Sequence, residues 1–336
     1  MEQKPGARGA AETADKQRDI QRQQDRKDEA RARAREAGQG PQPQKDKAVQ
    51  TGRTQPQDMP AQHLEKPGLE AEMALAPRFM APDYRGSGKL EGMAALVTGG
   101  DSGIGRAVAV LYAREGADVA IVYLDAQQDA QETRRCVENE GRRCLLIRGD
   151  VKDSAFCRQA VEQAVSEFGH LDILVNNAAF QEHANSLADI TDERLEETMK
   201  TNIFGYFYMA RAALPHLKQG ASIINTGSVV GLRGSSHLLD YSATKGAIHA
   251  FTMSLASSLI DKGIRVNAIA PGPVWTPLNP ADQTAEKVAE FGKATDFKRP
   301  AQPEELSPAY VFLAAPSCSS YITGIVLPVT GSVGAT

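Results

Sequence analysis

Residues 93–115 read MAALVTGGDSGIGRAVAVLYARE and contain an apolar run, a glycine-rich turn and a second apolar segment. Met93–Thr98 is short and almost continuously apolar, as expected of a strand buried on both faces of a sheet. Gly103–Glu115 repeats its apolar residues at helical spacing. A strand followed directly by a helix indicates a β-α unit, from which parallel sheets are built.

The same alternation continues along the chain. Further strands are expected at Val119–Tyr123, Cys144–Arg148, Leu171–Val175, Ala221–Thr226, Arg265–Ala270 and Gly324–Pro328. Helices are expected near Gln128–Glu140, Ser154–Phe168, Thr191–Leu217, Asp240–Lys262 and Glu304–Ala315. This order predicts a single α/β domain over residues 89–336, with a doubly wound parallel sheet and helices on both faces.

Residues 1–88 differ in composition from the rest of the 336-residue chain. No leucine precedes Leu64 and no aromatic residue precedes Phe79, so this segment has little apolar surface to offset its ordering entropy. Asp15–Ala37 is compatible with a helix, but Ile20 is its only large aliphatic residue, and a helix polar on all sides is not stable alone. We therefore predict a largely disordered or loosely helical extension. Its later apolar residues are expected to pack on the domain as an arm: Leu64, Leu69, Met73, Leu75 and Phe79.

Charge and cysteine content exclude several classes of function. A net charge of −4 gives no indication of a nucleic-acid binder. The N-terminus lacks the apolar segment of a secretory signal, and no run of about 18 apolar residues predicts a membrane span. The cysteines form no CxxC pair and no metal-like cluster with the histidines, so we expect no metal site and reduced thiols in a cytoplasmic protein. They are Cys136, Cys144, Cys157 and Cys318.

The turn after the first strand has the features of a dinucleotide-binding loop. Gly99, Gly103 and Gly105 permit positive φ and close backbone approach, and Ser102 and Ile104 lie between them at the start of the helix. The free N–H groups and partial positive charge of a helix N-terminus suit a pyrophosphate. The spacing is not the commoner GxGxxG, and a tight structural turn is the alternative, but the position at the first crossover favours a cofactor.

The ends of the second and third strands are expected to contact adenosine. An acid closing the second strand favours NAD, because it binds both ribose hydroxyls and repels a 2′-phosphate. Here Tyr123 holds that position, Leu124 holds the position where an arginine would favour NADP, and Asp125 follows late, so NAD and NADP both stay open. Asp150, which Val151 follows, can bond the adenine amine or cap the next helix.

Tyr241 and Lys245 lie four residues apart at the start of a predicted helix, which places them on one face. An ammonium beside a phenol favours the phenolate and lowers the tyrosine pKa from about 10. Tyr241 is then a credible general acid for a carbonyl oxygen or base for an alcohol, and Lys245 can also hold a ribose. An ordinary contact on a helix surface is the alternative.

Three further polar positions belong to the same edge. Ser228 follows the fifth strand, where its hydroxyl can bond a substrate oxygen, although a serine in a turn is the alternative. Asn202 is a polar residue inside the long helix and can hold a water near Lys245 or simply satisfy the core. Asn177 follows the fourth strand, where buried asparagines can tie neighbouring strand ends together.

These motifs together resemble the short-chain dehydrogenases/reductases over about residues 89–331. TGGDSGIG at 98–105, NNAA at 176–179 and YSATK at 241–245 are similar to that family's TGxxxGxG, NNAG and YxxxK. The resemblance implies a Rossmann-like seven-stranded sheet and hydride transfer between NAD(P)H and a carbonyl or alcohol. It also implies four catalytic residues: Asn202, Ser228, Tyr241 and Lys245.

The resemblance extends to the segment after the sixth strand. PGPVWT at 271–276 is similar to the family's PGxxxT, which implies cofactor contacts from Pro271, Gly272 and Thr276. A homotetramer built on the two long helices is implied, with Ile203, Phe207, Phe251 and Leu255 in the interface. PGLEAEM, HLLDYSATK and KRPAQPEEL are similar to a bacterial general-stress group that includes aldehyde reductases.

The substrate side is expected to lie under residues 275–298. Trp275, Leu278 and Phe291 are expected to supply apolar walls, and Gln181, His183 and His237 polar groups. An aldehyde or ketone reductase is the favoured function. The alternative is a non-enzymatic dinucleotide-binding stress or scaffold protein, against which the presence of all four catalytic groups counts.

Overall fold

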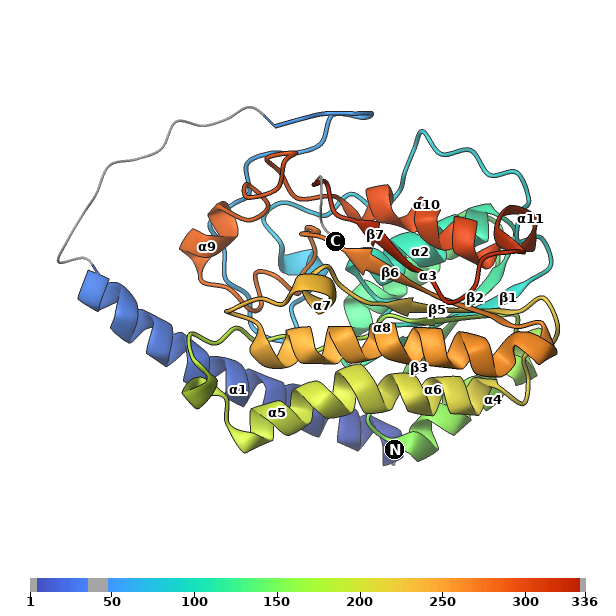
Figure 1. Cartoon of the computed structure of the whole chain (residues 1–336), viewed down its shortest axis with the longest axis horizontal. Helices are drawn as coiled ribbons and strands as arrows, with labels where there is room; N and C mark the ends of the chain where they lie inside the picture. The colour runs from blue at the N-terminus through green and yellow to red at the C-terminus, as the bar shows by residue number, and fades with distance from the viewer. Residues whose placement is uncertain (1–4, 36–47, 333–336) are drawn as a thin grey trace.

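The computed structural model describes residues 5–35 and 48–332, and its centre is a seven-stranded parallel sheet of order β3-β2-β1-β4-β5-β6-β7 (Figure 1). The strands are β1 (Ala94–Thr98), β2 (Asp118–Tyr123), β3 (Cys144–Arg148), β4 (Ile173–Asn176), β5 (Ser222–Thr226), β6 (Arg265–Pro271) and β7 (Val326–Val329). The order reverses between β1 and β4, as in a doubly wound Rossmann-like sheet. The predicted fold class is confirmed.

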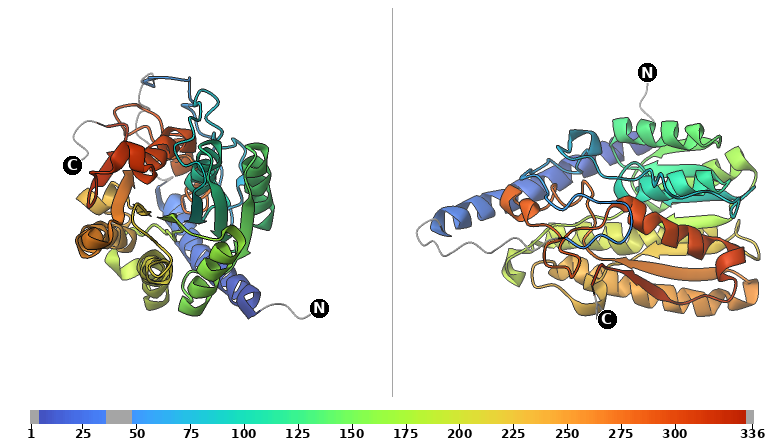
Figure 2. Two further views of the ribbon diagram at one scale, coloured as in Figure 1. Left: turned by 90° about the vertical axis from the view of Figure 1, so that its right-hand side faces the viewer. Right: turned by 90° about the horizontal axis from the view of Figure 1, so that it is seen from above.

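Helices cover both faces of this sheet (Figure 2). One face packs against α2 (Gly103–Arg114), α3 (Gln127–Asn139) and α10 (Pro303–Ala314). The other packs against α4 (Ser154–Phe168), α6 (Gly205–Ala213) and α8 (Leu239–Leu259). The shorter elements are α5 (Asp192–Met199), α7 (Val230–Arg233), α9 (Ala285–Ala289), α11 (Pro316–Ser319) and the 3-10 turns η1 (Glu70–Glu72), η2 (Leu187–Asp189) and η4 (Ile260–Lys262).

The central strand β1 is apolar up to Thr98 because both of its faces are buried. In β1, Ala95 and Val97 point into the core beneath α2 and α10, whereas Ala94 and Leu96 point into the core beneath α4 and α6. All four side chains are fully buried. Successive residues of a strand face opposite sides, so a central strand with a core on each side needs no polar positions.

The long helix expected over residues 191–217 is interrupted. A π-helical turn, η3 (Lys200–Phe204), separates α5 from α6. One extra residue in a helical turn cannot be read from apolar spacing, and such turns occur frequently at functional sites. Here the turn contains Asn202.

The described part of the N-terminal extension begins with a helix, where its composition predicts a largely disordered or loosely helical segment. Residues Pro5–Arg35 form a single helix, α1, that lies alongside α5 (Figure 1). The face toward the domain carries polar side chains spaced three or four residues apart, all at most 8% exposed. They are Thr13, Gln17, Gln21, Gln24 and Asp28. Hydrogen bonds to the domain replace the apolar stripe that normally docks a helix.

Residues 48–88 pack on the domain as the predicted arm. Met59, Leu64 and Met73 form a small core with Trp275 and its neighbours Ala281 and Val288. The indole N–H of Trp275 donates to the carbonyl of Leu75 at 2.8 Å. Within the described ranges, no helix combines the length and apolarity needed to cross a membrane.

Candidate active site

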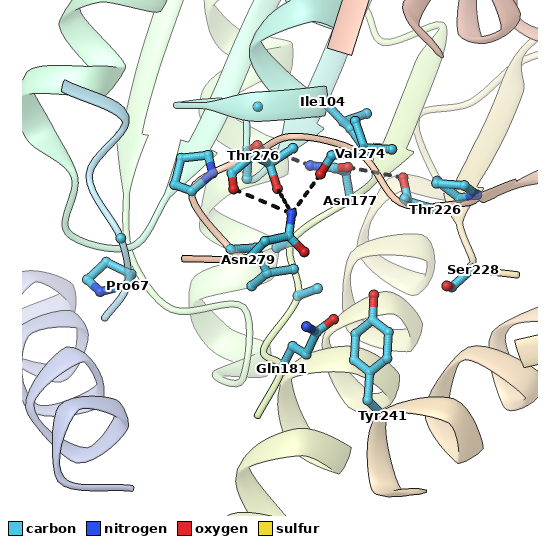
Figure 3. A pocket seen from close by; sticks show the side chains of 18 of the residues that line it. Pro67, Ile104, Asn177, Gln181, Thr226, Ser228, Tyr241, Val274, Thr276 and Asn279 are labelled. Atoms are coloured by element: carbon cyan, nitrogen blue, oxygen red, sulfur yellow. Dashed lines mark hydrogen bonds between the residues drawn. The ribbon is translucent and has the colours of Figure 1, made fainter. Parts of the chain in front are cut away.

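A cavity of about 670 Å³ opens at the carboxyl edge of the sheet, where the loops after β1 to β6 converge (Figure 3). This volume lies in the range typical of ligand and cofactor pockets, about 300–1,000 Å³. The cavity lies where the strand order reverses, which is the usual ligand position in open α/β sheets. Of the residues expected from the sequence to contact the cofactor, all line the cavity except Gly105. Asn202, which is predicted to be catalytic rather than to contact the cofactor, does not line it either.

The glycine turn is shaped by close backbone approaches. Gly99 has a φ of 61°, and a Cβ there would lie 3.0 Å from the Cα of Ala178. A Cβ on Gly105 would lie 1.9 Å from the carbonyl oxygen of Gly99, a distance that no side chain can occupy. Gly105 therefore lies behind the cavity wall, where its missing side chain lets α2 begin directly against the turn. The turn of residues 99–105, which we call the glycine cradle, fits a pyrophosphate at the helix N-terminus.

A carboxylate from the arm already contacts this helix N-terminus. Glu70 accepts a hydrogen bond from the N–H of Gly103 at 2.7 Å and pairs with Arg106. Burial raises the pKa of Glu70 to about 7, although Arg106 opposes the rise. The sequence reading missed Glu70, because the contact joins segments more than thirty residues apart and follows from the path of the arm.

Asparagines tie the strand ends together, as predicted. The side-chain amide of Asn177 donates to the carbonyl of Gly99 at 3.1 Å, and its oxygen accepts from the hydroxyl of Thr226 at 3.2 Å. Asn176 likewise donates to Asn225 at 2.9 Å. These bonds fix the ends of β1, β4 and β5 around the cavity.

The end of the cavity where adenosine contacts are expected combines predicted residues with residues of α1. Asp150 accepts a hydrogen bond from the hydroxyl of Thr13 at 2.5 Å and another from the N–H of Lys152 at 2.9 Å. Asp125 pairs with Arg148, and Arg18 of α1 lies 3.6 Å from its carboxylate. The loop after β2 therefore lies near cations, which the sequence reading did not anticipate.

Tyr241, Lys245 and Ser228 meet at the other end of the cavity. Helix α8 presents Tyr241 and Lys245 from one face, with the lysine Nζ 5.3 Å from the centre of the tyrosine ring. Nζ also donates to the carbonyl of Thr226 at 2.8 Å. Figure 3 shows the hydroxyl of Tyr241 pointing to the side of the cavity where Ser228 lies. The predicted juxtaposition of these three side chains is thus present.

The predicted direction of the Tyr241 pKa shift is wrong for this structure. Burial raises the pKa of Tyr241 above that of a free phenol, with further contributions from Asp282 and Tyr310, while a hydrogen bond with Ser228 opposes the rise. Burial also lowers the pKa of Lys245 to about 7. Sequence spacing places the ammonium beside the phenol but does not report how fully both are removed from water. Tyr241 is consequently protonated at neutral pH.

Asn202 connects the loop after β4 to helix α8. Its oxygen accepts from the N–H of Phe180 at 2.8 Å, and its amide donates to the carbonyl of Phe180 and to the hydroxyl of Thr244 at 3.1 Å. Thr244 in turn donates to the carbonyl of Tyr241. Of the two roles considered for Asn202, these contacts fit core satisfaction, and its catalytic role stays a prediction.

The segment after β6 closes the cavity above the glycine turn. Pro271, Gly272 and Thr276 line it, and a Cβ on Gly103 would lie 2.9 Å from the Thr276 side chain. Leu278, Phe291, Gln181 and His237 also line it, as expected. Trp275 and His183 do not: Trp275 is fully buried in the core of the arm, and His183 lies in a buried ion cluster.

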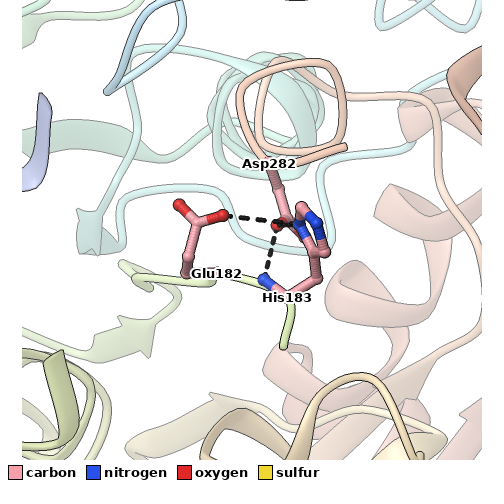
Figure 4. A group of neighbouring side chains, drawn as sticks. All are labelled: Glu182, His183 and Asp282. Carbon is pink, nitrogen blue, oxygen red and sulfur yellow. Dashed lines mark hydrogen bonds and ion pairs between the residues drawn. The ribbon is translucent and has the colours of Figure 1, made fainter. Parts of the chain in front are cut away.

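That cluster consists of Glu182, His183 and Asp282 (Figure 4). The two ring nitrogens of His183 lie 2.9 Å from Asp282 and 2.6 Å from Asp28 of α1. Burial opposes the positive charge, but hydrogen bonds to these carboxylates outweigh it and raise the pKa of His183 to about 11. The Lys66 ammonium lies 3.1 Å from Glu182. Two protein cations, His183 and Lys66, therefore lie among three carboxylates, and the arrangement is an ion-pair cluster.

A Rossmann-like sheet that brings a glycine cradle and a Ser-Tyr-Lys group to one cavity defines a nicotinamide-dependent dehydrogenase or reductase. A family model described as Enoyl-(Acyl carrier protein) reductase matches residues 99–333. General stress protein 39 of Bacillus subtilis is 53% identical over 82% of this chain and 96% of its own length. NADPH-dependent aldehyde reductase 1, chloroplastic, of Arabidopsis thaliana is 49% identical over 80% of this chain and 96% of its own.

Solved structures give the same assignment. A short-chain dehydrogenase from Burkholderia cenocepacia J2315, in complex with NADP, has a TM-score of 0.68 and 34% identity, covering 73% of this chain and 98% of its own. The chain belongs to the short-chain dehydrogenase/reductase family, in the group similar to the stress proteins and aldehyde reductases. It is an NAD(P)-dependent oxidoreductase that interconverts carbonyl and alcohol groups.

Proposed function

We propose that the protein reduces an aldehyde or ketone with NADPH or NADH and that Tyr241 protonates the carbonyl oxygen. The observation that carries this proposal is the position of Tyr241, whose raised pKa keeps its hydroxyl protonated where it meets Ser228 in the cavity. A protonated phenol is the form needed for reduction, because the acid must give a proton to the developing alkoxide. The name of the Arabidopsis relative, an aldehyde reductase, supports the same direction.

The residues divide the chemistry among them. A bound nicotinamide supplies the hydride to the carbonyl carbon. Ser228 donates a hydrogen bond to the carbonyl oxygen and stabilises its growing negative charge, while Tyr241 transfers the proton. Lys245, with a pKa lowered to about 7, can return a proton to the site at neutral pH. Asn202 holds α8 against the loop after β4 and so keeps Tyr241 in place.

The cofactor is assigned to the glycine cradle and the neighbouring strand ends. The first intrahelical bond of α2 runs from Arg106 N–H to Ser102 O, so the amide of Ile104, which lines the cavity, precedes it and can bind a pyrophosphate, while Gly105 lets the helix start this close to the turn. We assign the rest of the dinucleotide to residues at the strand ends and on α8. They are Gly99, Ser102, Gly103, Tyr123, Asp150, Val151, Asn177, Tyr241, Lys245, Pro271, Gly272 and Thr276.

A substrate panel tests this function. The full-length protein is incubated with aliphatic and aromatic aldehydes, ketones and the matching alcohols, each with NADPH and with NADH, and nicotinamide absorbance is followed. We expect turnover of at least one aldehyde or ketone class to the alcohol. Dinucleotide binding without turnover of any carbonyl or alcohol would instead favour the non-enzymatic alternative.

We also assign a homotetramer in the cytoplasm. Phe204, Phe207 and Met253 are 45–49% exposed on η3, α6 and α8, and Phe207 stacks on Phe251 with ring centres 4.0 Å apart. Such an apolar surface on neighbouring helices suits a subunit interface. Light scattering should give four times the 36.1 kDa chain mass, and Phe207→Glu should lower it. A monomeric wild-type mass would contradict the assignment.

A further inference from the structure

Helix α1 contacts the cavity that holds the proposed cofactor site, although it lies before the region that the family model matches. It flanks the cavity as the pale blue helix at the left of Figure 3. Thr13 and Gln17, one turn apart, line the same cavity as the glycine cradle and Tyr241. The helix is therefore placed to contact a bound dinucleotide directly.

A ring of polar contacts joins α1 to the adenosine end of the cavity. The hydroxyl of Thr13 donates to Asp150 at 2.5 Å, and the Lys152 ammonium lies 3.6 Å from the same carboxylate. Lys152 also bonds Glu197 at 2.6 Å, and Glu197 accepts from the amide of Gln17 at 3.0 Å. Thr13 and Gln17 are thus oriented by the residues that surround the adenine position, which gives them one fixed geometry toward the cavity.

Two further anchors hold the rest of the helix. The amide of Gln21 donates to the carbonyls of Leu64 and Ala281 at 2.6 and 2.9 Å, in a region where Gln21 is 2% exposed. Two turns further along the helix from Gln21, Asp28 bonds His183 at 2.6 Å. The helix consequently extends from the adenosine end of the cavity to the ion cluster beside its substrate end.

Two relationships between α1 and the cofactor are possible. The helix could compete, because Thr13 uses the carboxylate that the adenine amine needs. It could instead enclose the cofactor, because a carboxylate has about four acceptor positions and Asp150 uses them only partly, for the hydroxyl of Thr13 and the N–H of Lys152. The cavity of about 670 Å³ exists with α1 in its docked position, which favours enclosure.

We propose that α1 is the outer wall of the adenosine site, with Thr13 and Gln17 as cofactor-contact residues that retain the dinucleotide. This inference rests on the cofactor assignment made above. Because α1 docks mainly through hydrogen bonds, with Ile20 as its one large buried apolar side chain beside the small Ala10 and Ala14, it can release and dock again during cofactor exchange.

Cofactor release from full-length variants tests the wall. Thr13→Val and Gln17→Ala are combined, and the dissociation of NADPH and of NADH is followed by stopped-flow nicotinamide fluorescence. We expect the double variant to release the cofactor about tenfold faster than the wild type, because it loses the two modest hydrogen bonds that Thr13 and Gln17 are proposed to make to the dinucleotide. The matched control is Arg26→Gln, at an exposed position of α1 whose guanidinium donates to the carbonyl of Arg22 in the same helix. Its release rate should equal that of the wild type.

Three results would overturn the proposal. Slower release or tighter binding by the double variant would show that α1 competes with the cofactor. An unchanged rate would show that α1 does not contact it. A wild-type protein that binds neither dinucleotide would instead reject the cofactor assignment itself, which separates the two failures.

Hydrogen exchange of the wild-type chain gives a test that needs no variant. Amides of residues 9–29 are measured by mass spectrometry with and without saturating NADPH. A wall that closes on the cofactor predicts slower exchange in this segment by several-fold. Faster exchange on binding, or no change, would contradict enclosure.

Discussion

Replacing Lys245 by methionine should abolish activity and stabilise the fold at the same time. Lys245 is 1% exposed, and burial lowers its pKa from 10.5 to about 7. In the unfolded chain the ammonium is solvated and fully charged, so folding near neutral pH costs the free energy of discharging or burying it. A shift of this size corresponds to about 4 to 5 kcal/mol, at about 1.4 kcal/mol per pKa unit.

The substitution also removes a favourable contact. The bond from Lys245 to the carbonyl of Thr226 is worth about 1 kcal/mol net. That carbonyl still accepts from the hydroxyl of Tyr206 at 3.1 Å, so it is not left unsatisfied. Lys245→Met should therefore stabilise the protein by about 3 kcal/mol at pH 7. The folded-state pKa is depressed, so the wild-type penalty is absent above about pH 10.5 and grows as the pH falls toward 7.

Urea unfolding of both proteins at pH 7, 9 and 10.5 measures this difference, with turnover recorded in parallel. Lys262→Met, at an exposed lysine, is the control and should change stability little. If Lys245→Met is less stable than the wild type at pH 7, or if its gain in stability does not change with pH, the burial of Lys245 does not destabilise the folded protein.

Three further outcomes follow from particular contacts. Gly105→Ala should reduce the affinity for NADPH by about 100-fold or more, because the new Cβ would lie 1.9 Å from the carbonyl oxygen of Gly99. The control Gly52→Ala, whose Cβ would have no atom within 4 Å, should leave the affinity unchanged. Equal affinities for the two variants by calorimetry would refute the assignment of the glycine turn to the cofactor. Asp240→Asn should lower the free energy of unfolding in urea by about 3–5 kcal/mol, because it leaves the buried Arg194 without its counter-charge. In the wild type this guanidinium lies 2.9 Å from the Asp240 carboxylate. A loss below about 1 kcal/mol would contradict this. Burial and nearby Lys245 lower the pKa of His249 from 6.5 to about 4, so the stability of the wild type should fall as the pH drops from 6.5 through 4. In His249→Gln the melting temperature should depend less on pH over this range. Parallel melting-temperature profiles for the two proteins would contradict this.

The sequence was sufficient for the features that depend on local pattern. Apolar runs located the seven strands, because the five inner strands of the sheet are buried on both faces and the edge strands β3 and β7 are still partly covered. Glycine spacing located the tight turn to which we assign the cofactor, and a spacing of four placed Tyr241 beside Lys245. Each of these features is determined by residues close together in the chain.

What the sequence missed depends on contacts between distant segments. Helix α1 has no apolar stripe, and its buried face of Thr13, Gln17 and Gln21 has partners only once the sheet and the arm are in place. Glu70 reaches the start of α2 for the same reason. The direction of the Tyr241 pKa shift was wrong because desolvation depends on everything that packs around the ring.

The measurement closest to the central claim is hydride transfer by Tyr241→Phe, which keeps the ring and removes the proton donor. With an aldehyde or ketone identified from the panel, single-turnover oxidation of NADPH should slow by about 10²–10⁴-fold, while the dissociation constant for NADPH stays within about twofold. Tyr321→Phe, at a fully exposed tyrosine, should match the wild type in both. If Tyr241→Phe turns over at a near-normal rate, the proton comes from another group and the proposed chemistry is wrong.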